Sequence, residues 1–142
     1  LIEASQAGVH IDMVVRGICC LRAGVPDETD NIHIISIVGR YLEHSRIYIL
    51  GRGERARYYI GSADWMTRST LRRVEIAAPV TAPALKARLQ HIFNTMLADN
   101  SNARVQQPDG SYVRRMPGAD AVDCQAQFYE EAYQANVHSD LK

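Results

Sequence analysis

The chain has 142 residues, of which 46% are hydrophobic, and its 16 basic and 16 acidic residues give a formal net charge of zero. This length suits one compact domain with its own core, and this share of apolar residues argues against an intrinsically disordered chain. A net charge of zero excludes the strong global field that draws many proteins to nucleic acid or to anionic membranes.

The cysteines and the apolar stretches narrow the class of protein further. Three cysteines, of which Cys19 and Cys20 are adjacent, offer neither a disulfide framework nor the C-x-x-C spacing of a zinc site. No stretch is long enough to span a bilayer, and no secretory signal pattern occurs. The sequence predicts a soluble, cytoplasmic protein, with membrane association left open for the full-length protein. Because Leu1 stands inside a predicted helix without an initiator Met, we expect a fragment of a longer chain.

The first half of the chain predicts short elements separated by glycine-rich turns. A helix over 1–7 ends at Gly8, and a strand over 9–15 is followed by extended chain and a loop to 31. Ser36 is expected to cap a short helix that ends near His44. Strands over 46–50 and 57–61 flank Gly51-Arg52-Gly53 and predict a hairpin. A loop then leads to a strand over 73–77, which is expected to stop before Pro79.

The second half predicts a long helix over 82–100, a small hairpin around Asp109-Gly110, and a terminal helix over 119–136 within the segment 119–142. The long helix carries an apolar stripe that we interpret as core packing: Leu85, Leu89, Ile92, Phe93, Met96 and Leu97. Together these elements predict one α/β domain over 1–142, with a mixed β-sheet flanked by helices.

The basic residues are strongly biased towards arginine. Only two of them are lysines, and eight arginines fall between Arg40 and Arg73 with three acidic residues among them. The planar fork of arginine binds phosphate oxygens in pairs, whereas lysine acts as a point charge. The bias therefore indicates either an anionic ligand or a solvated rim, and composition leaves the two open.

His44 and Arg46 are the first candidate site residues. Residues two apart on a strand share a face, so their side chains are expected to project together at the start of the strand. Antiparallel pairing would bring Gly61-Ser62 back beside His44. The cluster then offers a proton carrier, a phosphate clamp and a small hydroxyl, which are parts that phosphoryl transfer needs. A structural or solvated histidine is the competing interpretation.

Arg16 is the second candidate, because it ends an apolar strand and precedes Gly17, where a ligand can approach the backbone closely. A surface arginine that caps carbonyl groups would look the same.

Trp65 and Met66 are expected to pack beneath the site. The other histidines show no metal-ligand spacing and are expected on the surface, so no metal site is predicted: His10, His33, His91 and His138.

Several long motifs, in the same order, resemble the last domain of polyphosphate kinases of the histidine-phosphorylating type. They are Val15-Arg16-Gly17-Ile18-Cys19-Cys20-Leu21, Gly24-Val25-Pro26, the stretch 36–46 (SIVGRYLEHSR) and the stretch 59–66 (YIGSADWM). Shorter similarities follow at Asp99-Asn100, Ala103-Arg104 and 109–112. The resemblance covers about residues 4–115 and fades afterwards.

This resemblance implies a phospholipase D-like fold and the reversible transfer of the terminal phosphate of ATP to inorganic polyphosphate through a phosphohistidine. It implies that the phosphorylated histidine and the Mg²⁺ contacts lie in a preceding domain outside this chain, so that the isolated chain is inactive. His44 matches a second histidine that faces the ATP phosphates as proton donor or charge stabiliser. Arg16 matches an arginine that holds nucleotide phosphate. Ser62 and Asp64 match a polar pair expected to orient His44.

ATP or ADP and polyphosphate are the expected partners, no nucleic acid is expected to bind, and the full-length protein is expected to be a homo-oligomer.

One alternative function is a phospholipase D-like phosphodiesterase half-site. Its signature, H-x-K, four residues and Asp, is altered here, because Arg46 replaces the lysine and Gly51 replaces the aspartate. An arginine in that place still suits phosphate binding. The other alternative is a non-catalytic module that binds polyphosphate through its arginines.

Overall fold

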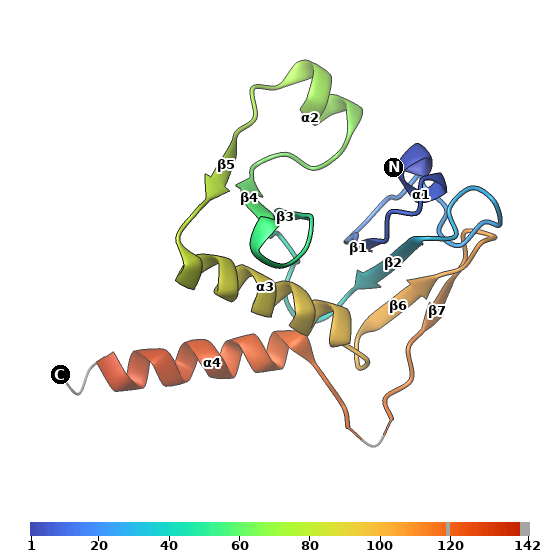
Figure 1. Ribbon diagram of the computed structural model, residues 1–142. Helices are drawn as coiled ribbons and strands as arrows, with labels where there is room; N and C mark the ends of the chain where they lie inside the picture. The colour runs from blue at the N-terminus through green and yellow to red at the C-terminus, as the bar shows by residue number, and fades with distance from the viewer. Residues whose placement is uncertain (119, 140–142) are drawn as a thin grey trace. The chain divides into compact units, whose positions relative to one another are not determined.

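The computed structural model describes residues 1–118 and 120–139, and these contain seven strands and four α-helices (Figure 1). The chain forms two compact units, one comprising Leu1–Glu43 with Met96–Lys142 and the other comprising His44–Thr95. Each unit has its own sheet. The predicted mixed sheet is therefore present, but the strands are divided between two sheets rather than gathered in one.

The sheet of the first unit is four-stranded and mixed, in the order β1-β2-β6-β7. Strand β1 (Ile11–Val14) runs parallel to β2 (Ile32–Ile37), β2 pairs antiparallel with β6 (Ala103–Gln106), and β6 pairs antiparallel with β7 (Tyr112–Arg114). The short helix α1 (Ile2–Gln6) precedes β1 and ends before Gly8, whose φ of +82° suits glycine. The β6–β7 hairpin around Asp109-Gly110 confirms the prediction made from that turn.

The core of this unit is built on the isoleucines of β2. Ile32 and Ile34 are fully buried with Ala23, and Ile11 and Met13 of β1 pack against them. Alternate residues of a strand face opposite sides of the sheet. The other side of β2 therefore carries the buried Ile35 together with His33, whose side chain is exposed.

The short helix predicted from Ser36 is wrong. Ser36 lies inside β2, opposite Arg104 of β6, in a strand that has isoleucine at four of its six positions. The following segment is held without helical bonds by the side chain of Gln125, which accepts a hydrogen bond from the Tyr41 N–H (2.8 Å) and donates one to the Tyr41 carbonyl (2.7 Å). These bonds to a distant residue hold 39–43 in a non-helical form that local propensity does not reveal.

The second unit contains a three-stranded antiparallel sheet in the order β3-β4-β5. Strands β3 (Ile47–Leu50) and β4 (Arg57–Gly61) form the predicted hairpin, in which Tyr48 lies opposite Tyr59. Gly51 and Gly53 take positive φ values of +89° and +57°, and a 3₁₀ turn (Gly53–Arg55) completes the connection. The glycines of the turn thus close the hairpin in the way that the sequence indicated.

The segment after β4 differs from the prediction. A helix, α2 (Thr67–Arg72), forms where a loop was expected, and β5 (Ala77–Val80) begins where the predicted strand should have ended. Pro79 lies inside β5, opposite Tyr59. An edge strand tolerates proline because its outer N–H needs no partner in the ladder, and β5 is an edge strand of this sheet.

The two long helices are confirmed with shifted bounds. Helix α3 (Pro83–Ala98) buries Met96 at its C-terminal end, whereas Leu85 near its start is 55% exposed, so the stripe is core for only part of its length. Helix α4 (Cys124–Ser139) begins five residues after the predicted start at Ala119. Ala119 and residues 140–142, which the predicted terminal segment included, lie outside the described residues. Within the described part of the chain, no helix is long and apolar enough to cross a membrane.

A buried carboxylate joins the end of α3 to β6 and α4. Asp99 is fully buried, and its Oδ1 accepts hydrogen bonds from the N–H groups of Ser101 (3.1 Å), Asn102 (2.7 Å) and Ala103 (3.0 Å). Its Oδ2 accepts one from the Cys124 N–H (2.9 Å). Burial alone would raise the pKa of Asp99, but the N–H donors of Cys124, Asn102 and Ala103 outweigh burial and hold that pKa below its ordinary value.

We predict that Asp99→Asn lowers the free energy of unfolding at neutral pH by about 2–3 kcal/mol, because the amide replaces a charged acceptor and leaves buried N–H groups unpaired. The folded-state pKa of Asp99 is depressed, so its stabilisation is present above the unfolded-state value of about 3.9 and is lost as pH falls through the folded-state value. Urea unfolding at neutral pH and at about pH 3 measures both effects.

Asp30→Asn is the matched control, because it makes the same substitution at an aspartate whose side chain is exposed. Its free energy of unfolding should stay within about 0.5 kcal/mol of the wild type. Two results would contradict a stabilising role for the ionised Asp99 carboxylate. One is an Asp99→Asn variant as stable as this control at neutral pH. The other is a loss of free energy of unfolding in Asp99→Asn that is as large at about pH 3 as at neutral pH.

Candidate functional site

An open pocket of about 460 Å³ lies at the start of β3. Its lining comes from β3 and the preceding residues, the end of β4, and α3: His44, Ser45, Arg46, Ile47, Ile60, Gly61, Leu89 and Ile92. The Gly61 N–H donates a hydrogen bond of 2.9 Å to the Arg46 carbonyl, so the antiparallel pairing of β3 and β4 continues to the pocket. The end of β4 therefore returns beside His44, as the predicted hairpin requires.

Tyr48 fixes the backbone that leaves the pocket after Gly61. A Cβ atom on Gly61 would lie only 2.9 Å from Cε2 of the Tyr48 ring, so a larger residue there would displace the ring. The Tyr48 hydroxyl donates a hydrogen bond of 2.8 Å to the Ala63 carbonyl. Glycine at position 61 thus allows the tyrosine to hold the turn that delivers Asp64.

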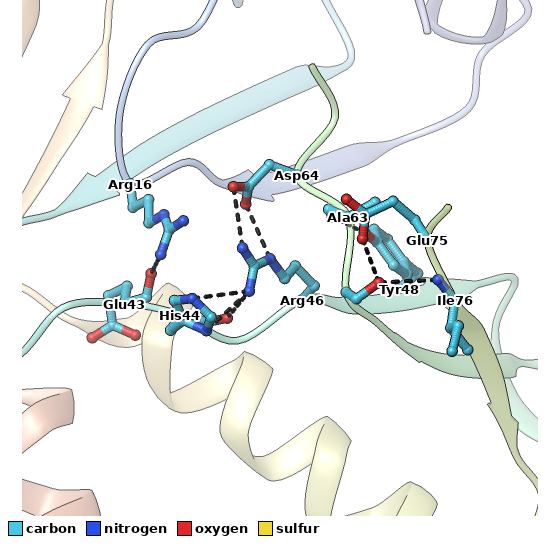
Figure 2. Close-up of polar contacts among 10 residues, drawn as sticks. Arg16, Glu43, His44, Arg46, Tyr48, Ala63, Asp64, Glu75 and Ile76 are labelled. Atoms are coloured by element: carbon cyan, nitrogen blue, oxygen red, sulfur yellow. Dashed lines mark hydrogen bonds and ion pairs between the residues drawn. The ribbon is translucent and has the colours of Figure 1, made fainter. Parts of the chain in front are cut away.

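Asp64 holds Arg46 in a bidentate ion pair (Figure 2). The guanidinium Nε lies 3.1 Å from Oδ1 of Asp64, and Nη2 lies 3.1 Å from Oδ2. The Arg46 side chain is 16% exposed and that of Asp64 is 31% exposed. Two parallel charge-assisted bonds in a half-buried place fix the plane of the guanidinium as well as its position.

The third edge of the Arg46 guanidinium contacts His44. Its Nη1 lies 2.9 Å from Nδ1 and 3.2 Å from Nε2 of the imidazole, and it donates to the His44 carbonyl at 3.1 Å. An atom so nearly equidistant from both ring nitrogens would overlap Cε1 if it lay in the ring plane. Nη1 therefore lies over one face of the imidazole, and the exposed ring remains at the pocket.

Ser62 is oriented away from this group. Its hydroxyl donates to the Glu75 carboxylate and accepts a bond of 3.0 Å from the Ile76 N–H. Ser62 thus joins the end of β4 to the segment that precedes β5, and any support that it gives to His44 is indirect. Of the predicted supporting pair, Asp64 contacts the Arg46–His44 group and Ser62 does not.

Arg16 belongs to the other compact unit, where it follows β1. Its Nη1 donates a hydrogen bond of 2.9 Å to the carbonyl of Glu43, the residue that directly precedes His44 in the chain. The Glu43 carboxylate in turn accepts a hydrogen bond from the side chain of the buried Gln125. Arg16 thus caps a carbonyl, which was one of the two interpretations left open by the sequence.

The expectation that Trp65 and Met66 pack beneath the site is wrong. Trp65 is 65% exposed and Met66 is 45% exposed. The indole stacks on the Tyr48 ring with a centroid distance of 5.8 Å. Conversely, Leu89 and Ile92 line the pocket although the sequence indicated only core packing for them. Their helical spacing is the same for a core and for a pocket wall, so no local signal distinguishes the two.

The pocket thus combines an exposed imidazole, a fixed cationic guanidinium and the backbone of Gly61 over an apolar wall from α3. An imidazole can donate or accept a proton, and a preorganised arginine stabilises negative charge on a neighbouring ligand. None of the lining residues is acidic. This composition suits an anionic ligand.

We predict that Arg46 and Asp64 are energetically coupled. Because the pair is half-buried and bidentate, Arg46→Ala and Asp64→Ala should each lower the free energy of unfolding by about 1–3 kcal/mol. The double variant should cost less than their sum, with a coupling energy of about 1–2 kcal/mol in urea unfolding. Glu54→Ala, which removes an exposed acid of the same unit, should be additive with Arg46→Ala. A coupling energy near zero for Arg46 and Asp64 would contradict the ion pair.

Comparison with known proteins agrees with the pattern found in the sequence. The family model described as polyphosphate kinase C-terminal domain 2 matches residues 1–127. The polyphosphate kinase of Synechocystis is 56% identical over 119 residues, which cover 84% of this chain and 16% of that protein. The polyphosphate kinase of Bacillus anthracis is 47% identical over 133 residues, which cover 93% of this chain and 19% of that protein. The chain thus spans about a sixth to a fifth of these relatives.

Among solved structures, the chain is similar to the crystal structure of polyphosphate kinase from Porphyromonas gingivalis. The TM-score is 0.88 with 37% sequence identity, and the match covers 95% of this chain and 21% of that one. This likeness confirms the predicted α/β fold class. The matched family model and the relatives together show that the chain belongs to the polyphosphate kinase family, as its C-terminal domain 2.

Proposed function

We propose that the pocket at the start of β3 handles phosphate groups in the reversible transfer of the terminal phosphate of ATP to inorganic polyphosphate. The observation that carries this proposal is the arrangement of Arg46, which Asp64 holds in a fixed plane and whose Nη1 contacts the His44 ring. A cation fixed in advance stabilises the charge that develops during transfer without reorganising when the substrate arrives. Membership of the polyphosphate kinase family supports the reaction class.

His44 is the proposed catalytic residue of this chain. It is exposed at the pocket mouth, and its ring is supported from one face by Arg46. There it acts as proton donor to, or charge stabiliser of, the phosphate that is transferred. The contact with Arg46 holds the His44 ring in place, whereas an ordinary surface histidine has no such fixed neighbour.

Arg46 is proposed both to attract phosphate and to position His44, and different atoms of its guanidinium serve these two purposes. Its Nε and Nη2 edge is engaged by Asp64, so a phosphate is not expected to take that edge while the ion pair lasts. Arg46 therefore contributes to phosphate binding through its charge and positions His44 through Nη1. Arg16 is proposed as the second phosphate-binding arginine, Asp64 as the support of Arg46, and Ser62 as an indirect support through its bonds to Glu75 and Ile76.

The pocket offers no ligand set for Mg²⁺. That ion prefers carboxylate and phosphate oxygens, and none of the described residues that line the pocket is acidic. The chain's membership of the polyphosphate kinase family supports the proposal that the Mg²⁺ contacts and the phosphorylated histidine lie in the rest of the enzyme. On this proposal the 142-residue chain transfers no phosphate alone, and ATP or ADP and polyphosphate meet it within a full-length, oligomeric polyphosphate kinase.

The test uses a full-length polyphosphate kinase that carries this segment. His44→Ala should lower kcat for ATP-dependent polyphosphate synthesis at least about 100-fold, because general acid catalysis contributes that much or more. Arg16→Ala should raise the KM for ATP, because it removes a phosphate ligand. Labelled phosphate trapped on the protein shows whether His44 acts before or after the phosphohistidine forms.

Arg52→Ala is the matched control, because Arg52 lies exposed in the β3–β4 turn outside the pocket lining. It should synthesise polyphosphate at the wild-type rate. A folded His44→Ala enzyme that does the same would refute the catalytic role. If the wild-type enzyme hydrolyses a phosphodiester and His44→Ala abolishes that hydrolysis, the phosphodiesterase alternative is favoured instead. Unchanged turnover with weakened polyphosphate affinity in an Arg46→Ala enzyme would favour the binding module.

A further inference from the structure

A second group of polar side chains lies on the sheet of the first unit. His10 directly precedes β1, Asp12 lies within it, and His33 lies on β2. Parallel pairing puts Asp12 opposite His33, and His10 is two residues from Asp12. Residues two apart on a strand and residues paired across neighbouring strands share a face, so the sheet presents all three side chains on one side.

The three side chains lie within reach of a single ion. The His10 Nε2 is 2.9 Å from Asp12 Oδ2, and the His33 Nδ1 is 3.7 Å from Asp12 Oδ1. The two imidazole centroids are 5.0 Å apart, and the three ligand atoms all lie within 4.8 Å of one another. Ligands of a tetrahedral zinc ion at about 2.1 Å are about 3.4 Å from each other, which falls between the two contacts with Asp12.

We propose that His10, Asp12 and His33 form a binding site for a Zn²⁺-like divalent cation. Two imidazoles and one carboxylate select a borderline transition metal over Mg²⁺ or Ca²⁺, which prefer oxygen ligands. Each protein ligand supplies one atom, so at least one coordination position stays open to water. The side chains are 42%, 31% and 60% exposed for His10, Asp12 and His33, which gives the ion direct access from solvent.

An ion pair between His10 and Asp12 accounts for their contact without any metal. It does not explain why the neighbouring strand brings His33 to the second oxygen of the same carboxylate, with a tilted ring close to that of His10. Two imidazole nitrogens and a carboxylate oxygen that converge in this way are a ligand set that zinc uses, and the β1–β2 pairing holds the backbones of Asp12 and His33 in register. The site lies outside the pocket lining and does not depend on the proposed phosphate chemistry.

The test is Zn²⁺ binding by the 142-residue chain, measured by calorimetry and by thermal unfolding. Because Cys19 and Cys20 could also bind Zn²⁺, every variant carries Cys19→Ser and Cys20→Ser. The chain with only these two serine substitutions is the parent. It should bind one Zn²⁺ per chain and unfold at a higher temperature with Zn²⁺ than without it. Asp12→Asn and His33→Ala should each weaken binding at least about tenfold, because they remove a direct ligand.

His91→Ala is the matched control, since His91 is an exposed histidine of α3 outside the cluster, and it should bind Zn²⁺ like the parent. Asp12→Asn keeps the shape of the side chain and removes only an exposed ion pair, so its unfolding temperature without metal should fall only slightly below that of the chain with Cys19→Ser and Cys20→Ser alone. The proposal is overturned if the parent shows no binding at millimolar Zn²⁺. It is equally overturned if Asp12→Asn and His33→Ala bind as tightly as His91→Ala.

Discussion

Two hydrogen bonds tie the guanidinium of Arg46 to the carboxylate of Asp64, and the arrangement of the pocket at the start of β3 follows from that pair. The pair sets the plane of the guanidinium, which leaves Nη1 to pack over His44. It also links the first residues of the hairpin to the turn that follows β4, which Tyr48 holds through the Ala63 carbonyl. An exposed histidine thereby gains a fixed neighbour, which is the physical difference between a solvated imidazole and a preorganised one.

Local patterns predicted the parts of the fold that local chemistry decides. The Gly51-Arg52-Gly53 turn, the Asp109-Gly110 hairpin and the stop at Gly8 all require conformations or turn residues that are visible in the sequence. The elements that were missed depend on distant partners. Ser36 was assigned to a helix because its pairing with Arg104 of β6 is not visible locally, and Pro79 was excluded from a strand because an edge position is a property of the whole sheet.

The same distinction applies to the two groups of site residues. His44 and Arg46 are two apart on one strand, so their proximity could be predicted, whereas the bidentate role of Asp64 depends on a contact across 18 residues. His10, Asp12 and His33 showed no metal-ligand spacing because the third ligand arrives through parallel strand pairing, which follows no local rule. Sequence spacing detects ligand sets carried on one element, and it misses those assembled by a sheet.

The central claim is that the His44–Arg46 pocket binds phosphate, and an NMR titration of the wild-type chain with inorganic tripolyphosphate tests it most directly. The resonances to follow are the His44 ring, the Arg46 Nε–H and the Gly61 N–H, which lie together at the pocket. The account predicts saturable shifts of all three, with the Asp109-Gly110 turn, which is outside the pocket lining, unchanged. Tripolyphosphate that leaves these three resonances unmoved, or that shifts only residues elsewhere in the chain, would contradict it.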